Sequence, residues 1–382
     1  MDETAARQTE TPGPGGSAET DPAAGRASAR LKRDQIRGTA LGRAEVPLSV
    51  LDLAPVGEGY TPGQALAATT ELARRAEEWG YHRFWVAEHH GMPGVASSSP
   101  PVLLAHLAAA TRTIRVGSGG VMLPNHAPLV VAEQFGTLHA LHPDRIDLGL
   151  GRAPGTDPAT ASALGRPGSA EEFPQHVADL ARFLDDSFPA GHRYASVHAV
   201  PGRSGAPEEG RPPIWLLGSS GFSAQLAGLM GLPFAFAHHF SGANTVPALD
   251  LYRESFRPSD ALDKPYAMVS VAAVAADSFE RARWLAGPAA LSMLRLRRGM
   301  PGRIPTPEQA AAYPYNPMEQ DFVDAWLDNF VLGDPEEVRR GLAQLRARTG
   351  ADELMITGHV HGHEDRRRSY ELIAQVHGML GS

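Results

Sequence analysis

Short apolar runs alternate along the chain with longer segments in which apolar residues recur at helical spacing. The apolar runs are almost continuous, as in RFWVAE at 83–88 and PFAFAHHF at 233–240, and most end in glycine or polar residues. Such runs are typical of parallel strands that are buried on both faces. The pattern predicts eight strands, at 46–55, 83–88, 114–123, 145–155, 213–221, 233–240, 265–277 and 351–360.

A segment with helical periodicity follows each predicted strand. The segment 62–80 stops at Gly80, and 100–112 begins with two prolines, as helices often do. Eight strand–helix units predict an α/β fold of the closed (β/α)8 TIM-barrel type. An open, doubly wound sheet is the alternative, although no run has the character of an edge strand. Further helices are predicted at 128–143, 172–188, 222–231, 246–257, 278–298, 322–331, 335–349 and 364–380.

Two segments depart from this alternation. Residues 1–45 contain no Phe, Trp, Tyr or Val, so they cannot bury enough apolar surface to offset the entropy of ordering. We expect a disordered tail at 1–45, in which a short helix fits 31–43, and a barrel domain at 46–382. The proline-rich insertion at 299–320 is a candidate lid, because long loops at a barrel mouth often gate it.

Composition narrows the classes of function. The 382 residues include no cysteine, which excludes disulfides, thiolate metal sites and a cysteine nucleophile. The formal net charge of −8, without a strong basic patch, argues against nucleic-acid binding. No apolar run reaches the roughly 18 residues of a membrane span, and the N-terminus lacks the apolar core of a signal peptide. We therefore expect no membrane contact and a cytoplasmic location.

Polar and glycine residues stand where the predicted strands end. In a (β/α)8 barrel, catalytic groups lie at the C-terminal ends of the strands. The barrel would therefore gather at one mouth groups that are far apart in the sequence. They are Asp52, Glu88–His90, Ser118–Gly120, Arg152, Ser219–Ser220, His238–His239 and Thr357–His359.

Two of these groups have more than one interpretation. Gly119–Gly120 interrupts an apolar strand, which indicates either a bulge or a flat ring packed against bare backbone. His89 and His90 are adjacent on an extended segment and point to opposite sides, so they are not expected to share one site. An imidazole here can act as a base, a ring partner or a metal ligand, or simply form a hydrogen bond within the fold.

A serine-rich turn after the fifth strand predicts an anion site. Ser219, Ser220 and Ser223 would add hydroxyls to the free backbone N–H groups at the start of a helix. Helix capping alone explains one serine, but not three. Arg152 can clamp a phosphate through two hydrogen bonds or form a surface ion pair. Its place at the same mouth as the serines favours phosphate.

Four stretches carry a resemblance to the bacterial luciferase-like, flavin-dependent monooxygenases: VAEHH, IRVGSGGVMLPNHAPLVVAEQFGTL, RIDLGLGRAPG and PIWLLGSSGFSAQLAGLMGLPFAFAHHF. The resemblance covers about 46–380 and is closest to a branch of single-chain oxidoreductases. It implies a barrel that binds reduced FMN, or in some branches the deazaflavin F420, at its C-terminal mouth. Reduced FMN from a separate flavin reductase would react with O2 through a flavin hydroperoxide, and one oxygen atom would enter a small organic substrate. The family often forms homodimers.

The resemblance also implies roles for single residues. His89 would be the catalytic imidazole beside the flavin, and His90 its neighbour. The bond between Gly119 and Gly120 would match the family's non-prolyl cis peptide beside the flavin ring. The flavin phosphate would be bound by Arg152, Ser220 and Ser223, and by Ser219, which replaces an acid of the luciferase subunit. No residue is expected to bind a metal.

Other interpretations stay open. Gly151 stands where the luciferase catalytic subunit has a cysteine, so light emission and an aldehyde substrate are not carried over from the family. A metal-dependent hydrolase on the same barrel would draw on His238–His239 and on the histidines of 359–363. A non-catalytic flavin-binding subunit is a further alternative, against which the presence of His89 and Arg152 argues.

Overall fold

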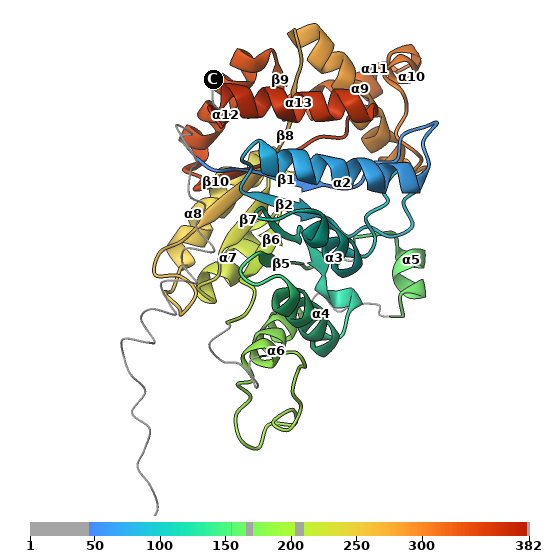
Figure 1. Ribbon diagram of the computed structural model, residues 1–382. Helices are drawn as coiled ribbons and strands as arrows, with labels where there is room; N and C mark the ends of the chain where they lie inside the picture. Colours follow the sequence, from blue (N-terminus) through green and yellow to red (C-terminus); the bar gives the residue numbers. More distant parts are fainter. Residues whose placement is uncertain (1–45, 154, 166–170, 203–209, 380–382) are drawn as a thin grey trace, which may run out of the picture.

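The computed structural model describes residues 46–153, 155–165, 171–202 and 210–379, and its centre is a closed ring of eight parallel strands. Figure 1 shows the strands in the middle of the molecule. Hydrogen bonds join these strands in the order β1-β2-β3-β5-β6-β7-β8-β10, and β10 also pairs with β1 and so closes the ring. The (β/α)8 prediction is confirmed and the open sheet is wrong. The strands are β1 (Leu48–Asp52), β2 (Arg83–Val86), β3 (Arg115–Ser118), β5 (Ile146–Gly151), β6 (Ile214–Gly218), β7 (Phe234–Ala237), β8 (Ala267–Ala275) and β10 (Glu353–Thr357).

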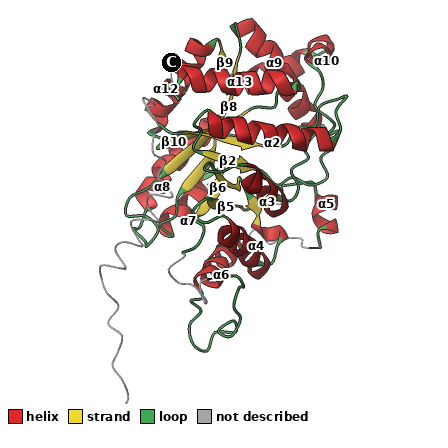
Figure 2. Cartoon of the chain, in the orientation of Figure 1, coloured by secondary structure: helices red, strands yellow, loops and turns green. Residues whose placement is uncertain are grey.

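Helices cover the outside of the ring (Figure 2). Within the described ranges, no helix is both long enough and apolar enough to cross a bilayer. The predictions for 1–45, including the helix at 31–43, fall outside the described residues. The barrel helices are α2 (Pro62–Glu78), α3 (Pro100–Ala110), α4 (Pro128–Leu141), α6 (Phe173–Asp185), α7 (Gly221–Leu229), α8 (Thr245–Ser255), α12 (Pro335–Thr349) and α13 (His363–Val376).

Local sequence explains where these helices begin and end. Helix α2 follows Thr61, whose hydroxyl accepts from the backbone N–H of Gln64 while the Gln64 side chain accepts from the backbone N–H of Thr61. Helix α12 starts with a similar reciprocal cap between Asp334 and Glu337, and ends at Gly350, which has a φ of 60°. Each N-terminal cap satisfies an N–H group that the helix leaves unpaired and contributes about 1 kcal/mol, and the N–H of Gly350 donates to the carbonyl of Arg346 at the other end of α12.

The third predicted strand is shorter than expected. It stops at Ser118 and resumes as the two-residue β4 (Val121–Met122), with Gly119 and Gly120 between the two parts. Strand β4 pairs with the end of β5, so the chain continues along the same edge after the interruption. The predicted break in apolar character is therefore a break in the strand itself.

One further helix was misplaced, and other short elements were missed. The helix predicted at 322–331 is α11 (Pro317–Leu327), because Asn316 caps it and Pro317 occupies its first turn. Val331 instead opens β9 (Val331–Gly333), which pairs with the last three residues of β8. A short helix, α5 (Pro158–Ala163), was not predicted.

The chain leaves the barrel after β8 and returns at α12. This excursion, residues 276–334, contains α9 (Phe279–Arg297), α10 (Pro307–Ala312), α11 and β9. Figure 1 shows these elements together at one side of the barrel, at the top of the view. Its apolar side chains pack in a cluster that includes Val274 of β8 and Val360 after β10.

The excursion is also hydrogen-bonded to the loop that follows β1. Ile304 forms a parallel bridge with Gly57, in which its N–H donates to the carbonyl of Val56 at 3.0 Å and its carbonyl accepts from Glu58 at 2.8 Å. The proline-rich segment 299–320 is thus attached at the rim of the barrel.

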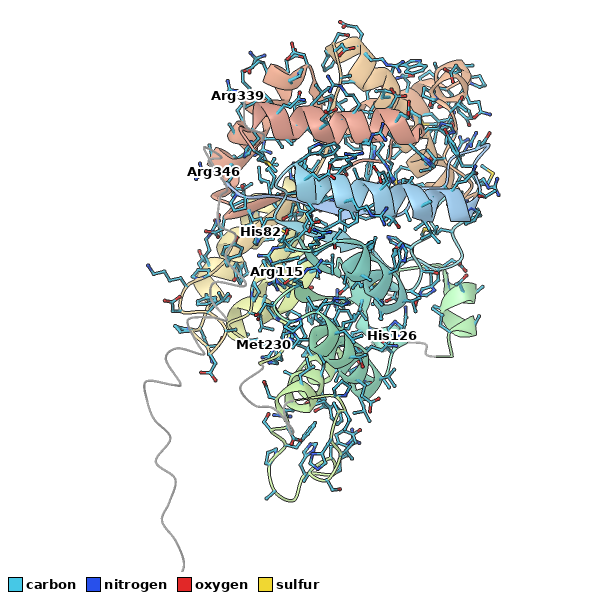
Figure 3. The ribbon with its side chains drawn as sticks, viewed as in Figure 1. His82, Arg115, His126, Met230, Arg339 and Arg346 are labelled. Atoms are coloured by element: carbon cyan, nitrogen blue, oxygen red, sulfur yellow. The ribbon has the colours of Figure 1, made fainter. Side chains whose placement is uncertain are left out.

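Charged side chains form a buried network inside the barrel, near the N-terminal ends of the strands. Arg83 bonds Asp147 at 2.9 Å and Glu353 at 3.0 Å, and all three side chains are inaccessible to solvent. Arg115 bonds Asp147 at 2.6 Å, and the Tyr266 hydroxyl donates to Glu353 at 3.0 Å. Figure 3 shows Arg115 among the strands. We call these five residues the buried ion network; it fills the end of the barrel away from the cavity described next.

Candidate active site at the C-terminal ends of the strands

A cavity of about 400 Å³ opens at the C-terminal ends of the barrel strands. Its volume lies within the range typical of small-molecule sites. Gly120 is not among the residues that line it. The other six predicted site residues all line the cavity: His89, Gly119, Arg152, Ser219, Ser220 and Ser223. The barrel therefore brings together groups that are up to 134 positions apart, from His89 to Ser223.

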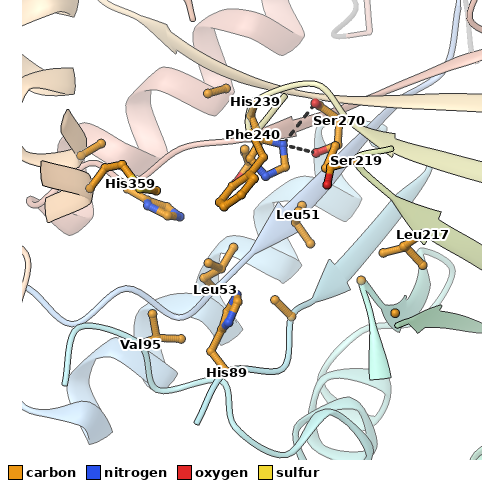
Figure 4. A pocket seen from close by; sticks show the side chains of 18 of the residues that line it. Leu51, Leu53, His89, Val95, Leu217, Ser219, His239, Phe240, Ser270 and His359 are labelled. Atoms are coloured by element: carbon orange, nitrogen blue, oxygen red, sulfur yellow. Dashed lines mark hydrogen bonds between the residues drawn. The ribbon is translucent and has the colours of Figure 1, made fainter. Parts of the chain in front are cut away.

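His89 projects into the cavity from the loop after β2, as Figure 4 shows. Its Nδ1 lies 3.1 Å from the carbonyl oxygen of Gly155. Because a carbonyl oxygen can only accept, this hydrogen bond places the ring proton on Nδ1 and leaves Nε2 as an acceptor. Burial lowers the pKa of His89, although the Gly155 carbonyl and the charge of Glu88 oppose that shift. The ring is therefore neutral near pH 7.

The side chains of the residues on either side of His89 point away from the cavity and make contacts within the protein. The buried carboxylate of Glu88 lies 2.9 Å from Nε2 of His90 and 2.9 Å from Nε2 of His126, and accepts from the backbone N–H of Met122 at 3.0 Å. Burial raises the pKa of Glu88, but these hydrogen bonds outweigh burial and hold it below its usual value. The prediction that His89 and His90 point to different sides is confirmed: His89 lines the cavity, and Glu88 and His90 fix the chain around β4.

Two further imidazoles line the cavity without having been assigned to the site. His239 follows β7, and its Nδ1 lies 3.2 Å from the carbonyl oxygen and 2.8 Å from the hydroxyl of Ser270, the bonds drawn in Figure 4. His359 follows β10 and also lines the cavity. Burial lowers the pKa of His239, and burial followed by the nearby His239 lowers that of His359 to about 4.

Sequence alone could not select these two histidines. His238 and His239 are adjacent, and the alternation of an extended backbone decides which one faces inward. His238 is buried with its Nδ1 2.7 Å from the hydroxyl of Thr245, away from the cavity. The partner that orients His239 is Ser270, which lies 31 positions away in the sequence.

The peptide bond between Gly119 and Gly120 is cis, so this prediction is confirmed. Both positions lack room for a side chain. A Cβ at Gly119 would lie 2.7 Å from Leu51 Cδ1, and one at Gly120 would lie 2.9 Å from the carbonyl oxygen of Gly149. Gly119 lines the cavity, while Gly120 is packed behind it against β5.

Gly151 has a specific neighbour. A Cβ there would lie 2.8 Å from the sulfur of Met122, which also lines the cavity. The side chain of Met122 therefore occupies the space that a residue larger than glycine would need at position 151.

The serine turn and Arg152 form one face of the cavity. Ser220 is the N-cap of α7 but makes no side-chain capping bond, and a Cβ at Gly218 would lie 2.6 Å from Cβ of Ser223, so the glycine lets the helix start close to β6. The hydroxyls of Ser219, Ser220 and Ser223 form no hydrogen bond with any described residue. The guanidinium of Arg152 stacks 4.2 Å over the ring of Phe222 and has no acidic partner among the described residues. We call these four polar residues the anion cradle.

Asp52, which was expected at the mouth, faces the fold. Its carboxylate accepts from the hydroxyl of Thr69 at 2.8 Å and from Arg366 at 3.0 Å. His361 also turns away, with Nε2 2.9 Å from the carbonyl oxygen of Glu58. In the described part of the chain, no group of three or more His, Asp or Glu side chains is arranged to hold a metal ion. The metal-dependent hydrolase interpretation gains no support from this geometry.

The chain is similar to several known proteins over most of its length. It is 52% identical to the uncharacterized protein YvbT of Bacillus subtilis, over 87% of this chain and 97% of the relative. It is 47% identical to a luciferase-like monooxygenase of Escherichia coli K12, over the same shares of the two chains. Among solved structures, apo-MsnO8 superposes with a TM-score of 0.79 at 36% identity, covering 89% of this chain and all of that one.

The family model described as luciferase-like monooxygenase matches residues 46–353. That range includes all the barrel strands up to the first residue of β10, and every residue of the anion cradle. The chain belongs to the luciferase-like monooxygenase family.

Proposed function

We propose that the protein is an FMN-dependent monooxygenase. Reduced FMN, supplied by a separate flavin reductase, and O2 would be consumed, one oxygen atom would enter a small organic substrate, and the other would leave as water while the flavin is oxidised. The observation that supports this proposal most directly is the anion cradle, which shares one cavity with Gly119 and His89.

The residues of the cavity fit a phosphorylated flavin. Three hydroxyls, the start of α7 and the Arg152 guanidinium offer donors to a phosphate, and these side chains have no other polar partner among the described residues. Thr357 also lines the cavity, and its hydroxyl is buried without a partner in the described part of the chain. Buried donors without partners are rare in folded proteins and are a sign that a ligand completes them.

The flat ring of the flavin would pack against the backbone at Gly119, where a side chain is absent. When bound, reduced FMN supplies the electrons that activate O2. The chain's own part is to position the ring, to exclude water and to manage protons. Buried apolar side chains of the cavity wall, among them Leu51, Trp85 and Met355, keep water away from the reacting atoms.

His89 is placed to hold or move a proton. Its Nε2 is free to accept, because Nδ1 is committed to Gly155. Because burial lowers its pKa, the imidazole stays neutral and able to accept at neutral pH. A general base or acid of this kind typically contributes about 10²–10⁴-fold to a rate.

The test is a titration of the purified protein with FMN and with F420, followed by reductase-coupled oxygen uptake. We expect micromolar or tighter binding of FMN and weaker binding of F420. His89→Ala should keep FMN affinity within about threefold and lose about 10²–10⁴-fold in turnover. His142→Ala, at a half-buried position at the end of α4 and outside the cavity, is the control and should change neither. Tighter binding of F420 than of FMN, or no flavin binding, would refute the proposal.

A further inference from the structure

One part of the cavity is walled by the excursion rather than by the barrel strands. Met293 and Leu296 of α9 and Trp326 and Phe330 around the end of α11 line it, together with Phe240 from the loop after β7. The ring of Trp326 meets Phe240 edge-on at 6.1 Å and lies 6.3 Å from Phe330. We call these five residues the apolar chamber. A chamber of this composition would hold a ligand by removing its apolar surface from water.

The charges of the cavity limit what the chamber can accept. Among the described residues that line the whole cavity, Arg152 is the only one with an acidic or strongly basic side chain. The proposed function commits this guanidinium to the flavin phosphate. A carboxylate or an ammonium group on a substrate would therefore be buried without a counter-ion, which is strongly unfavourable. The three imidazoles do not change this balance, because burial lowers the pKa of each and keeps them neutral.

His239 supplies a polar contact beside the chamber. It directly precedes Phe240 in the chain, and Figure 4 shows its ring next to the ring of Phe240. The carbonyl oxygen of Ser270 lies 3.2 Å from Nδ1 and can only accept, which places the ring proton on Nδ1. The hydroxyl oxygen of Ser270, 2.8 Å from Nδ1, then accepts the same proton, and Nε2 carries a lone pair and no proton. Nε2 makes no hydrogen bond with any described residue. It can therefore accept a hydrogen bond from a ligand.

We propose that the apolar chamber binds an uncharged, largely apolar substrate whose polar group donates a hydrogen bond to Nε2 of His239. This inference rests on the proposed function, since it assigns Arg152 to the cofactor. It defines the substrate class as molecules with one hydroxyl or N–H donor on an apolar body, and it excludes carboxylates. His239 is then the residue that selects among uncharged molecules, and Ser270 positions its ring.

Three probes of nearly equal size test the proposal. 1-Octanol has an apolar chain and a donor, its isomer 1-methoxyheptane has the chain without a donor, and octanoate has the chain with a charge. Isothermal titration calorimetry on the FMN-saturated protein should show the tightest binding for 1-octanol, several-fold weaker binding for 1-methoxyheptane, and at least tenfold weaker binding for octanoate than for 1-octanol. Octanoate binding as tightly as 1-octanol would overturn the assigned substrate class.

His239→Phe keeps an aromatic ring of similar size and removes the acceptor. It should abolish the preference for 1-octanol over 1-methoxyheptane and leave FMN affinity within about threefold. His239→Gln, which retains a side-chain acceptor, should restore part of the preference. An undiminished preference in His239→Phe would overturn the role of His239.

The outcome is separable from that of the proposed function. If the protein does not bind FMN, the proposed function fails, and the three probes are then compared on FMN-free Arg152→Ala protein, whose cavity lacks the guanidinium. The same order of affinities there would support the chamber's selectivity by itself. Equal affinities would overturn it.

Discussion

In the described part of the chain, polar groups are paired at one end of the barrel interior and lack partners at the other. At the N-terminal end, Arg83 is shared between Asp147 and Glu353, and the charges of the buried ion network neutralise one another. At the C-terminal end, the hydroxyl of Ser220 and the guanidinium of Arg152 have no polar partner among the described residues, although they lie in the same barrel. Both ends are built from the same eight strands.

This contrast suggests a division along the barrel axis, with residues that stabilise the fold at one end and residues that can bind a ligand at the other. Charges that are buried and fully paired hold the strands in register, whereas donors that lack partners are available to a ligand. Substitutions at the N-terminal end should therefore change the free energy of unfolding, and substitutions at the C-terminal end should change binding. The following predictions test that division, beginning with the largest expected effect.

Arg83→Met should lower the free energy of unfolding by about 3–5 kcal/mol. The substitution leaves the buried carboxylate of Glu353 without its basic partner and leaves Asp147 with one basic partner fewer. Urea denaturation followed by circular dichroism measures the change. The control is Arg339→Ala, which breaks an exposed pair with Glu336 on α12 (Figure 3) and should cost less than about 1 kcal/mol. A loss of similar size in both variants would show that the buried ion network contributes no more to the free energy of unfolding than an exposed ion pair.

Arg152→Ala should weaken FMN binding by about 10–100-fold, the range expected for one or two hydrogen bonds to a charged phosphate. Its free energy of unfolding in the absence of FMN should change by less than about 1 kcal/mol, because Arg152 has no ionic partner to lose among the described residues. Fluorescence titration of FMN and urea denaturation give the two values. A large loss of stability with unchanged FMN affinity would contradict the assignment of Arg152 to ligand binding rather than to stability.

The smallest effect concerns pH. The pKa of His359 is lowered to about 4 by burial, so the folded protein resists protonation there while the unfolded chain takes up the proton near pH 6.5. Stability should fall as the pH drops from 6.5 to 4, and His359→Phe should remove its share of that fall, on the order of 1–2 kcal/mol after a discount for the partial exposure of the ring to solvent. The carboxyl of Asp147, with a pKa lowered to about 2 by Arg115 and Arg83 against the effect of burial, loses its contribution only between about pH 4 and 2.

These pH windows separate the contribution of His359 from that of Asp147. Unfolding of the FMN-free protein measured at pH 7, 5 and 4 reports mainly on the histidines. If His359→Phe shows the same slope as the original protein over this range, the lowered pKa of His359 does not contribute to stability.

The parts of the molecule that sequence predicts well are those set by local pattern. The strand positions follow from apolar runs, and the break at Gly119 follows from two adjacent glycines in a strand. The serines of the anion cradle stand close together in the sequence at the start of one helix, so the sequence alone indicates that they lie close together in the fold. The confirmed cis bond came from the family resemblance and not from the pattern.

The parts that were missed depend on contacts between distant segments. His239 faces the cavity because Ser270 holds its ring, and nothing near His239 encodes that contact. Arg83 and Glu353 are 270 positions apart, and each looks like an ordinary surface charge at the start of a strand. Asp52 was placed at the mouth because it ends a strand, but Arg366 of the last helix draws its side chain into the fold. The oligomeric state and the reductase partner stay predictions.

The attachment of the excursion at Ile304 bears on how molecules enter. Its first residues continue from β8, and its middle is hydrogen-bonded to the loop after β1, on the other side of β10. A segment that is attached at its start and again at its middle forms a fixed frame, whereas a hinged flap is free at one end. The opening that this frame leaves should then admit molecules according to the side chains on its inner edge, Pro301 and Ile304 among them. Shortening those side chains should widen the entrance while the backbone hydrogen bonds that hold Ile304 to the loop after β1 stay in place.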